Sequence, residues 1–263
     1  PIPTLFAFLS QVLSADGSCQ DAVARVNADR IAAGEAPTSP DTGAYCKARK
    51  RMPEEFPHAL MTETANSMEE ATPVHWLWKE RHVKWMDGST VIMADTQENQ
   101  ASYPQQGTQK EGVGFPIARL VAVFSAATGC VLDLAMGPYS GKGTGEHSLL
   151  RQLLHCFQAG DIAVGDAYYS AFFLLAIFKR LDVDAVLRAD GKRRVDFRSG
   201  KRIGKKDHEV IWTKPQRPEW MDEERYREMP DHLVIRECSM SIDRPGFRAK
   251  KITLVTTLLD PKY

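Results

Sequence analysis

The sequence has few cysteines, no long apolar run and no net charge. Its five cysteines are scattered and odd in number, with no C-x-x-C pair: Cys19, Cys46, Cys130, Cys156 and Cys238. Disulfide frameworks and zinc clusters use paired, closely spaced thiols, so these cysteines indicate reduced side chains in a cytoplasmic protein. No apolar stretch approaches the roughly 18 residues of a membrane span, and no signal-peptide pattern opens the sequence.

The remaining composition is that of an ordinary globular protein. At 263 residues, with 43% hydrophobic and 26% charged residues, the chain can bury one large core or two modest ones. Charges balance overall, but residues 188–206 carry nine Lys/Arg against Asp190 and Asp196. This segment is therefore predicted to contact a polyanion. A solvated basic hairpin is the alternative.

Residues 1–80 have the spacing of helices. Apolar side chains recur at helical intervals over 4–13, and further helices are predicted after Ser18, at 43–51 and at 53–70. The helix at 43–51 ends in a basic turn, which suits the negative end of a helix dipole. A helical N-terminal domain that binds DNA and an ordinary helical bundle both fit this pattern.

From about residue 78 the pattern changes to strands and turns. A run of strands followed by alternating helices and strands predicts an α/β fold with a mixed sheet. The strands are expected at 83–87, 90–94, 117–124, 130–136, 161–165, 183–188 and 252–258, and the helices at 146–157 and 170–181. Residues 190–250 are polar and broken by prolines, so they are predicted to form a β-rich insertion before the last strand.

Two aspartates, Asp87 and Asp166, each end a short apolar run that is typical of a strand. Carboxylates held side by side on strand ends bind hard cations, so the pair predicts a site for Mg²⁺ or Mn²⁺. Asp95 also ends a strand-like run and is the second choice for the first acid. Arg188, at the end of the next strand, can bind a phosphate bidentately. An Asp-Gly turn and a helix-capping Asp are the structural alternatives, and no third acid is placed by spacing to join the pair.

Five stretches of the chain together resemble a known family of enzymes. They are Met86-Asp87-Gly88-Ser89-Thr90 with Asp95-Thr96-Gln97-Glu98-Asn99-Gln100, Gln109-Lys110-Glu111-Gly112-Val113-Gly114-Phe115-Pro116, Gly165-Asp166-Ala167-Tyr168-Tyr169-Ser170, and Val255-Thr256-Thr257-Leu258-Leu259-Asp260-Pro261. Taken together, they resemble the DDE transposases of bacterial insertion sequences, specifically the insertion-sequence-four family. The resemblance runs over most of the chain.

The resemblance implies an RNase H-like catalytic core at 81–263, with the β-rich insertion between the second and third acids. It implies Asp87 as the first acid, with Asp95 as second choice, and Asp166 as the second, together holding Mg²⁺ or Mn²⁺. The family's third acid is a glutamate in a Tyr-x-x-Arg-x-x-x-Glu-x-x-x-x-x-x-Lys helix, a pattern that this sequence lacks. That helix would begin shortly after Tyr263, so truncation before the third acid is the expectation.

The implied activity is hydrolysis of DNA followed by strand transfer, with no covalent enzyme–DNA intermediate. The implied partners are double-stranded DNA, as transposon ends and target, and a second copy of the chain in a synaptic complex at the bacterial nucleoid. Basic residues are expected along the DNA backbone, where contacts depend on salt and not on sequence. These are Arg188, Lys192, Arg193, Arg194, Lys201, Arg202, Lys205 and Lys206.

Two other functions fit the same residues. The first is an inactive truncated remnant that at most binds DNA, because two aspartates without the glutamate leave a metal pair under-ligated. The second is another RNase H-like nuclease that uses Glu146 or Glu237 as its third acid. Metal-dependent nicking of DNA would favour the nuclease, and retention of DNA without cleavage would favour the remnant.

Overall fold

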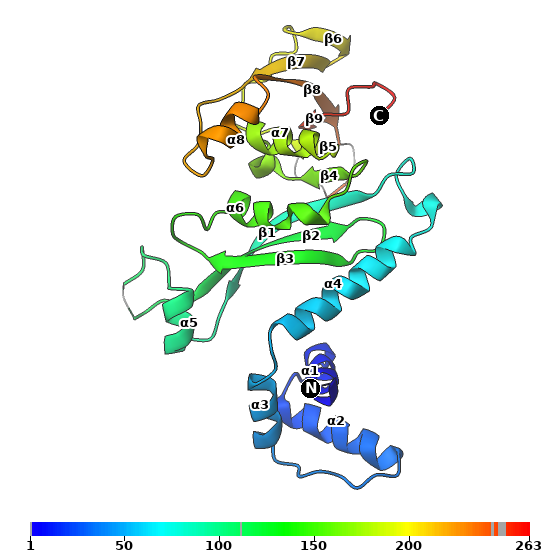
Figure 1. Cartoon of the computed structure of the whole chain (residues 1–263), viewed down its shortest axis with the longest axis vertical. Coiled ribbons are helices and arrows are strands. Elements are labelled where there is room, and N and C mark those ends of the chain that lie inside the picture. Colours follow the sequence, from blue (N-terminus) through cyan, green and yellow to red (C-terminus); the bar gives the residue numbers. More distant parts are fainter. Residues whose placement is uncertain (1, 111, 243–244, 247–250) are drawn as a thin grey trace. The chain divides into compact units, whose positions relative to one another are not determined.

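The structure, a computed structural model, describes residues 2–110, 112–242, 245–246 and 251–263 (Figure 1). Parts of the motif at 109–116 and of the expected insertion at 190–250 lie outside the described residues, namely Glu111, 243–244 and 247–250, as does Pro1. The chain forms two compact units, Pro1–Thr64 and Ala65–Tyr263. The domain boundary expected at residue 80 stays a prediction.

The first unit consists of helices. They are α1 (Ile2–Leu13), α2 (Cys19–Ala32), α3 (Gly43–Lys50) and the first part of α4 (Glu55–Glu70), which runs past Thr64. The Ser18 hydroxyl caps α2 by accepting the Asp21 N–H at 3.1 Å. The buried Gln11 of α1 accepts hydrogen bonds from Tyr45 at 2.6 Å and Arg49 at 2.9 Å, both on α3. A buried amide needs such partners, so Gln11 ties α1 to α3.

The second unit is built on a nine-stranded mixed sheet, and the predicted mixed α/β class is confirmed. The strand order is β3-β2-β1-β4-β5-β9-β8-β7-β6. The strands are β1 (Val83–Ile92), β2 (Ile117–Ser125), β3 (Val131–Pro138), β4 (Ile162–Gly165), β5 (Asp184–Arg188), β6 (Lys201–Gly204), β7 (Asp207–Thr213), β8 (His232–Ser241) and β9 (Lys251–Thr256). Strands β1, β4 and β5 are parallel, and all other neighbours are antiparallel.

Short helices connect these strands. They are η1 (Val74–Trp76), α5 (Gln97–Ser102), α6 (Glu146–Leu150), η2 (Arg151–Cys156), η3 (Ala167–Tyr169), α7 (Phe172–Arg180) and α8 (Glu223–Glu228). The helix predicted at 146–157 is present but changes from α to 3₁₀ geometry at Arg151. A 3₁₀ turn aligns residues three apart, which places Leu150 and Leu153 together towards the core.

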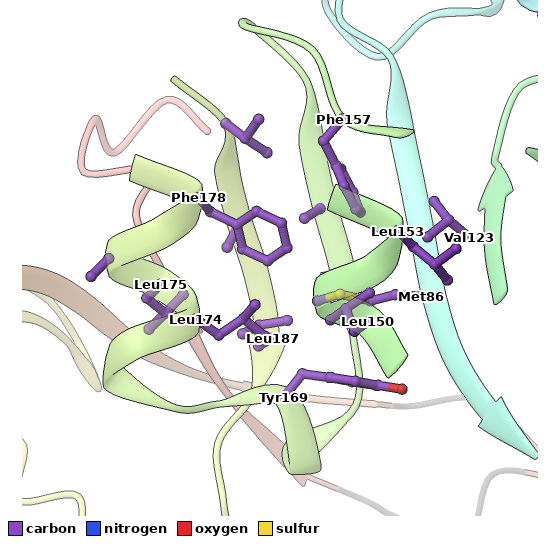
Figure 2. Packing of buried hydrophobic residues seen from close by; sticks show 14 of the residues in the cluster. Met86, Val123, Leu150, Leu153, Phe157, Tyr169, Leu174, Leu175, Phe178 and Leu187 are labelled. Atoms are coloured by element: carbon purple, nitrogen blue, oxygen red, sulfur yellow. The ribbon is translucent and has the colours of Figure 1, made fainter. Parts of the chain in front are cut away.

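The main hydrophobic core lies between the sheet and the segment that contains α6, η2 and α7. Figure 2 shows Met86 and Val123 from the strands meeting Leu150 and Leu153 of the α6–η2 segment, and all four are buried. On the α7 side, the ring of Phe178 packs edge-on against Phe157, with centroids 5.0 Å apart. Each such buried side chain contributes about 1.5–3 kcal/mol of transfer free energy. This core contains Met86 of β1 and Ala163 of β4, so it packs the part of β1 that pairs with β4.

The structure differs from the sequence prediction at β1. Strands expected at 83–87 and 90–94 form one continuous strand, so Asp87 lies in the middle of β1 and not at its end. The neighbour β4 pairs with β1 only from Val83 to Met86, whereas β2 pairs along the whole of β1. From Asp87 onward β1 has a neighbour on one side, and most of its residues are exposed. The apolar pattern therefore breaks where burial ends, while backbone pairing continues.

The segment predicted to be β-rich contains β6, β7, α8 and β8. Trp212 of β7 is buried, and its indole N–H donates to Glu237 of β8 at 3.1 Å. The fully buried His208 lies 3.0 Å from the other carboxylate oxygen of Glu237. Trp212 thus anchors this part of the sheet, and the Glu237 carboxylate is occupied by structural partners.

Candidate active site

Register brings Asp87, Asp166 and Arg188 to equivalent positions on neighbouring strands. Met86 pairs with Gly165, and Gly165 pairs with Leu187. Asp87, Asp166 and Arg188 are the residues that come directly after these three in the chain. Neighbouring strands are about 4.8 Å apart, so the last β1–β4 pair, Met86 and Gly165, sets the aspartates that follow these two residues side by side. Both aspartates line one hollow at the carboxyl edge of the parallel strands.

Each aspartate is exposed and makes one short hydrogen bond to nearby backbone. Oδ1 of Asp87 accepts the N–H of Gly88 at 2.9 Å, and Oδ1 of Asp166 accepts the N–H of Tyr168 at 2.8 Å. Asp166 is therefore the cap of η3 as well as the residue that follows β4. In the described part of the chain, these bonds use Oδ1 alone and leave Oδ2 of each aspartate for another ligand.

Glu146, the first residue of α6, approaches the pair from another element. A Cβ at position 88 would overlap its carboxylate, so only the glycine of the Asp-Gly pair allows this approach. The Tyr169 hydroxyl donates to Oε2 of Glu146 at 3.3 Å. Of the two alternatives for a third acid, Glu146 and Glu237, it is Glu146 that lies against the Asp87-Gly88 segment.

The charges of these three acids affect the pKa of Tyr169. Burial raises the pKa of its phenol, and the negative charges of Glu146, Asp166 and Asp87 raise it further. The phenol consequently stays protonated and acts as a donor to Glu146. Gly165 leaves room for the Tyr169 ring, because a Cβ at position 165 would lie 3.0 Å from that ring.

His147 is the basic group next to these acids. Its Nε2 lies 2.8 Å from the carbonyl oxygen of Tyr168. Burial lowers the pKa of His147, although the Tyr168 carbonyl and the charge of Asp166 act in the opposite direction. The imidazole is therefore neutral near pH 7. The sequence offered Glu146 as an alternative third acid, but no local pattern connected His147 to the aspartates.

Asp95 is placed differently from Asp87. It lies beyond the end of β1, and its Oδ1 accepts from the Gln100 side chain at 2.8 Å. Five residues of strand separate Asp87 from Ile92, which is about 17 Å. The register therefore brings Asp87, and not Asp95, to Asp166.

The basic residues of 188–206 are exposed, and several of them have acidic partners. Arg193 binds Glu237 at 3.0 Å and lies over the Trp212 ring, 3.6 Å from its centroid. Lys201 binds Glu209 at 3.1 Å. Lys205 and Lys206 form the two-residue turn between β6 and β7. The segment alone has nine cations and two aspartates, a net charge of seven. Glu209 and Glu237 add two carboxylates beside these cations, which lowers the net charge of this surface to about five.

A tight cluster of metal-binding side chains occurs elsewhere. Of the residues that the structure describes, one group of three places its ligand atoms within 4.8 Å of one another: Asp133, His155 and Cys156. Asp87, Glu146 and Asp166 are more widely spaced than this.

The sequence matches no protein-family model. No curated protein matches it significantly. Among the described helices, none combines the length and the apolar character that crossing a membrane requires.

Proposed function

We propose that this chain is a metal-dependent DNA strand-cleaving and strand-transferring enzyme of the DDE transposase type. The observation that carries the proposal is that strand register sets Asp87 and Asp166 side by side at the edge of the central parallel strands, while Glu146, hydrogen-bonded to the Tyr169 hydroxyl, lies against Gly88. Two carboxylates on adjacent strands and a third from a helix are the donors that a hard divalent cation takes.

The fold supports this proposal in its general form. A mixed sheet with helices on its core face carries both aspartates at its parallel centre, and β-rich strands follow Asp166, as an RNase H-like core with an insertion requires. The resemblance places the third acid in a helix that this sequence lacks, whereas Glu146 is the acid brought next to the pair. Glu237 is unsuited to that role because His208, Trp212 and Arg193 occupy it.

The residues fit Mg²⁺ or Mn²⁺. Asp87 and Asp166 are exposed and would hold the ion through their carboxylate oxygens, with Glu146 completing the set. The chemistry supplied by such ions when bound is activation of water or a DNA 3′-hydroxyl and stabilisation of the leaving oxygen. Tyr169 orients Glu146 by its hydrogen bond. Arg188, one strand away, would hold a DNA phosphate.

A DNA cleavage assay tests whether Glu146 is the third acid of the site. Glu146→Gln keeps the length of the side chain and an acceptor for Tyr169 but removes the charge. We expect this variant to lower Mn²⁺-dependent nicking of a supercoiled plasmid by about 10²-fold or more. Chelation of the metal is expected to stop nicking by the unsubstituted chain.

The outcomes separate the candidate functions. Nicking that is unchanged in Glu146→Gln would remove this residue from the site and leave the third acid to another segment. Retention of DNA with no nicking in Mg²⁺ or Mn²⁺ would support the second candidate, a remnant that only binds DNA. That candidate is favoured by the spacing of the three carboxylates, which exceeds that of a tight metal cluster.

The proposed DNA surface is the basic segment 188–206, and the proposed assembly is a dimer on paired transposon ends. We expect Lys205→Gln combined with Lys206→Asn to weaken duplex binding and to reduce the slope of log K against log salt by about 1 to 2. Lys206 has a φ of 58°, which asparagine tolerates, so the turn should be preserved.

The matched control is Lys142→Gln combined with Lys179→Gln, which removes two exposed lysines outside the basic segment. Its salt slope should equal that of the unsubstituted chain. A slope that stays the same in the Lys205/Lys206 variant would place this turn outside the DNA interface.

A further inference from the structure

A second set of metal ligands lies at the opposite edge of the central strands. Asp133 is on β3, and His155 and Cys156 end η2. The carbonyl of Cys156 accepts from Lys84 at 2.7 Å, and Lys84 pairs with Asp161, which precedes β4. The group therefore belongs to the amino edge of β1 and β4, whereas Asp87 and Asp166 stand at the carboxyl edge.

The contacts of His155 suit a metal ligand. Its Nδ1 lies 3.0 Å from the carbonyl oxygen of Gln152, and its Nε2 lies 2.8 Å from Oδ2 of Asp133. Both ring nitrogens thus face oxygen acceptors. With the proton on Nδ1, Nε2 turns its lone pair towards the Asp133 carboxylate, and a cation bound by both groups would stabilise this tautomer. A carbonyl that orients Nδ1–H is the usual outer partner of a metal-bound histidine.

The third donor identifies the class of ion. The Sγ of Cys156 lies 3.8 Å from Nε2 of His155. Around a tetrahedral zinc ion, sulfur and nitrogen ligands stand about 3.6 Å apart and nitrogen and oxygen ligands about 3.3 Å. The sulfur is therefore in place, and the Asp133–His155 contact needs to open by about half an ångström. Sulfur, nitrogen and oxygen donors together favour Zn²⁺ or Co²⁺ over Mg²⁺.

We propose that Asp133, His155 and Cys156 bind one divalent transition-metal ion of the zinc class. The side chain of His155 is 62% exposed, so an ion in solution can reach the cluster. The ion would join β3 to the end of the continuous segment α6–η2, whose first residue is Glu146. Its role is to hold this segment on the sheet, independently of the Mg²⁺ chemistry proposed above.

The test uses Co²⁺ titrated into the metal-free whole chain, because thiolate-bound Co²⁺ has a charge-transfer band in the near ultraviolet. We expect one equivalent to bind with this band, Zn²⁺ to displace it, and Mg²⁺ to leave it unchanged. Cys156→Ser should abolish the band, and His155→Gln, at an exposed side chain, should lower the affinity at least tenfold. Cys238→Ser, which removes a half-buried cysteine of β8, is the matched control and should retain the band.

Three results would overturn the proposal: no band in the unsubstituted chain, a band that persists in Cys156→Ser, or an affinity that is equal in His155→Gln. Circular dichroism of each variant shows whether it is folded. Asp166→Asn separates the two sites, since it should retain the band even though it removes a ligand of the proposed Mg²⁺ site.

Discussion

Asp166→Asn is expected to lower metal-dependent DNA cleavage by about 10³-fold, because a neutral amide removes several kcal/mol of charge stabilisation from the transition state. The same loss is expected for Asp87→Asn, since register places both carboxylates at one site. Binding of Mn²⁺, followed by electron paramagnetic resonance, should weaken at least tenfold in both variants.

The fold should survive these substitutions. An amide at position 166 would keep the Oδ1 that accepts the Tyr168 N–H, and an amide at position 87 would keep the acceptor for Gly88. Asp95→Asn is the matched control, because it makes the same chemical change in the turn before α5. Full activity is expected there. Loss of activity in Asp95→Asn with retention in Asp87→Asn would reverse the assignment of the first acid.

Lys84→Ala is expected to destabilise the protein by about 3–5 kcal/mol, because it leaves a buried charge without its partner. Lys84 and Asp161 are each 6% exposed in their side chains, and Nζ lies 2.6 Å from Oδ2 of Asp161. The substitution also removes the donor to the Cys156 carbonyl at 2.7 Å. Urea unfolding monitored by circular dichroism measures the change in the free energy of unfolding.

Two controls show that burial is the cause. Lys142→Ala breaks an ion pair of similar length, 2.8 Å to Glu219, whose side chains are 89% and 84% exposed, and should have no measurable effect. Adding Asp161→Asn to Lys84→Ala should recover part of the loss, because the orphaned charge is gone while an acceptor for the Gln158 N–H is kept. Equal destabilisation by Lys84→Ala and Lys142→Ala would contradict this account.

Local patterns predicted the elements well and one boundary poorly. The helices near 4–13 and 43–51 and the strands near 117–124 and 183–188 all appear, because apolar periodicity records which side of an element is buried. Periodicity failed at β1, where one strand looked like two. There the exposure of the residues changes at Asp87 while their hydrogen bonding to β2 does not.

In the candidate site, too, local patterns identified the residues, and tertiary contacts decided which of them are neighbours. The aspartates at 87 and 166 were visible as acids that follow apolar runs, and so was the rival at 95. Only the pairing of Met86 with Gly165 distinguishes Asp87 from Asp95. Residue spacing offered both Glu146 and Glu237 as a third acid and could not choose between them, and it did not connect Tyr169 to the site, because α6 and η3 meet the strands through packing at Gly88 and Gly165.

The sequence by itself determined the order of helices and strands, the α/β class and the acids available for chemistry, because these depend on residue type and on spacing within one element. Tertiary structure alone decided which acids are neighbours and how many of the basic charges are free. It also decided that Asp133, His155 and Cys156 form one cluster. Such contacts join residues that lie far apart in the chain, and strand register and core packing, which no local pattern specifies, bring them together.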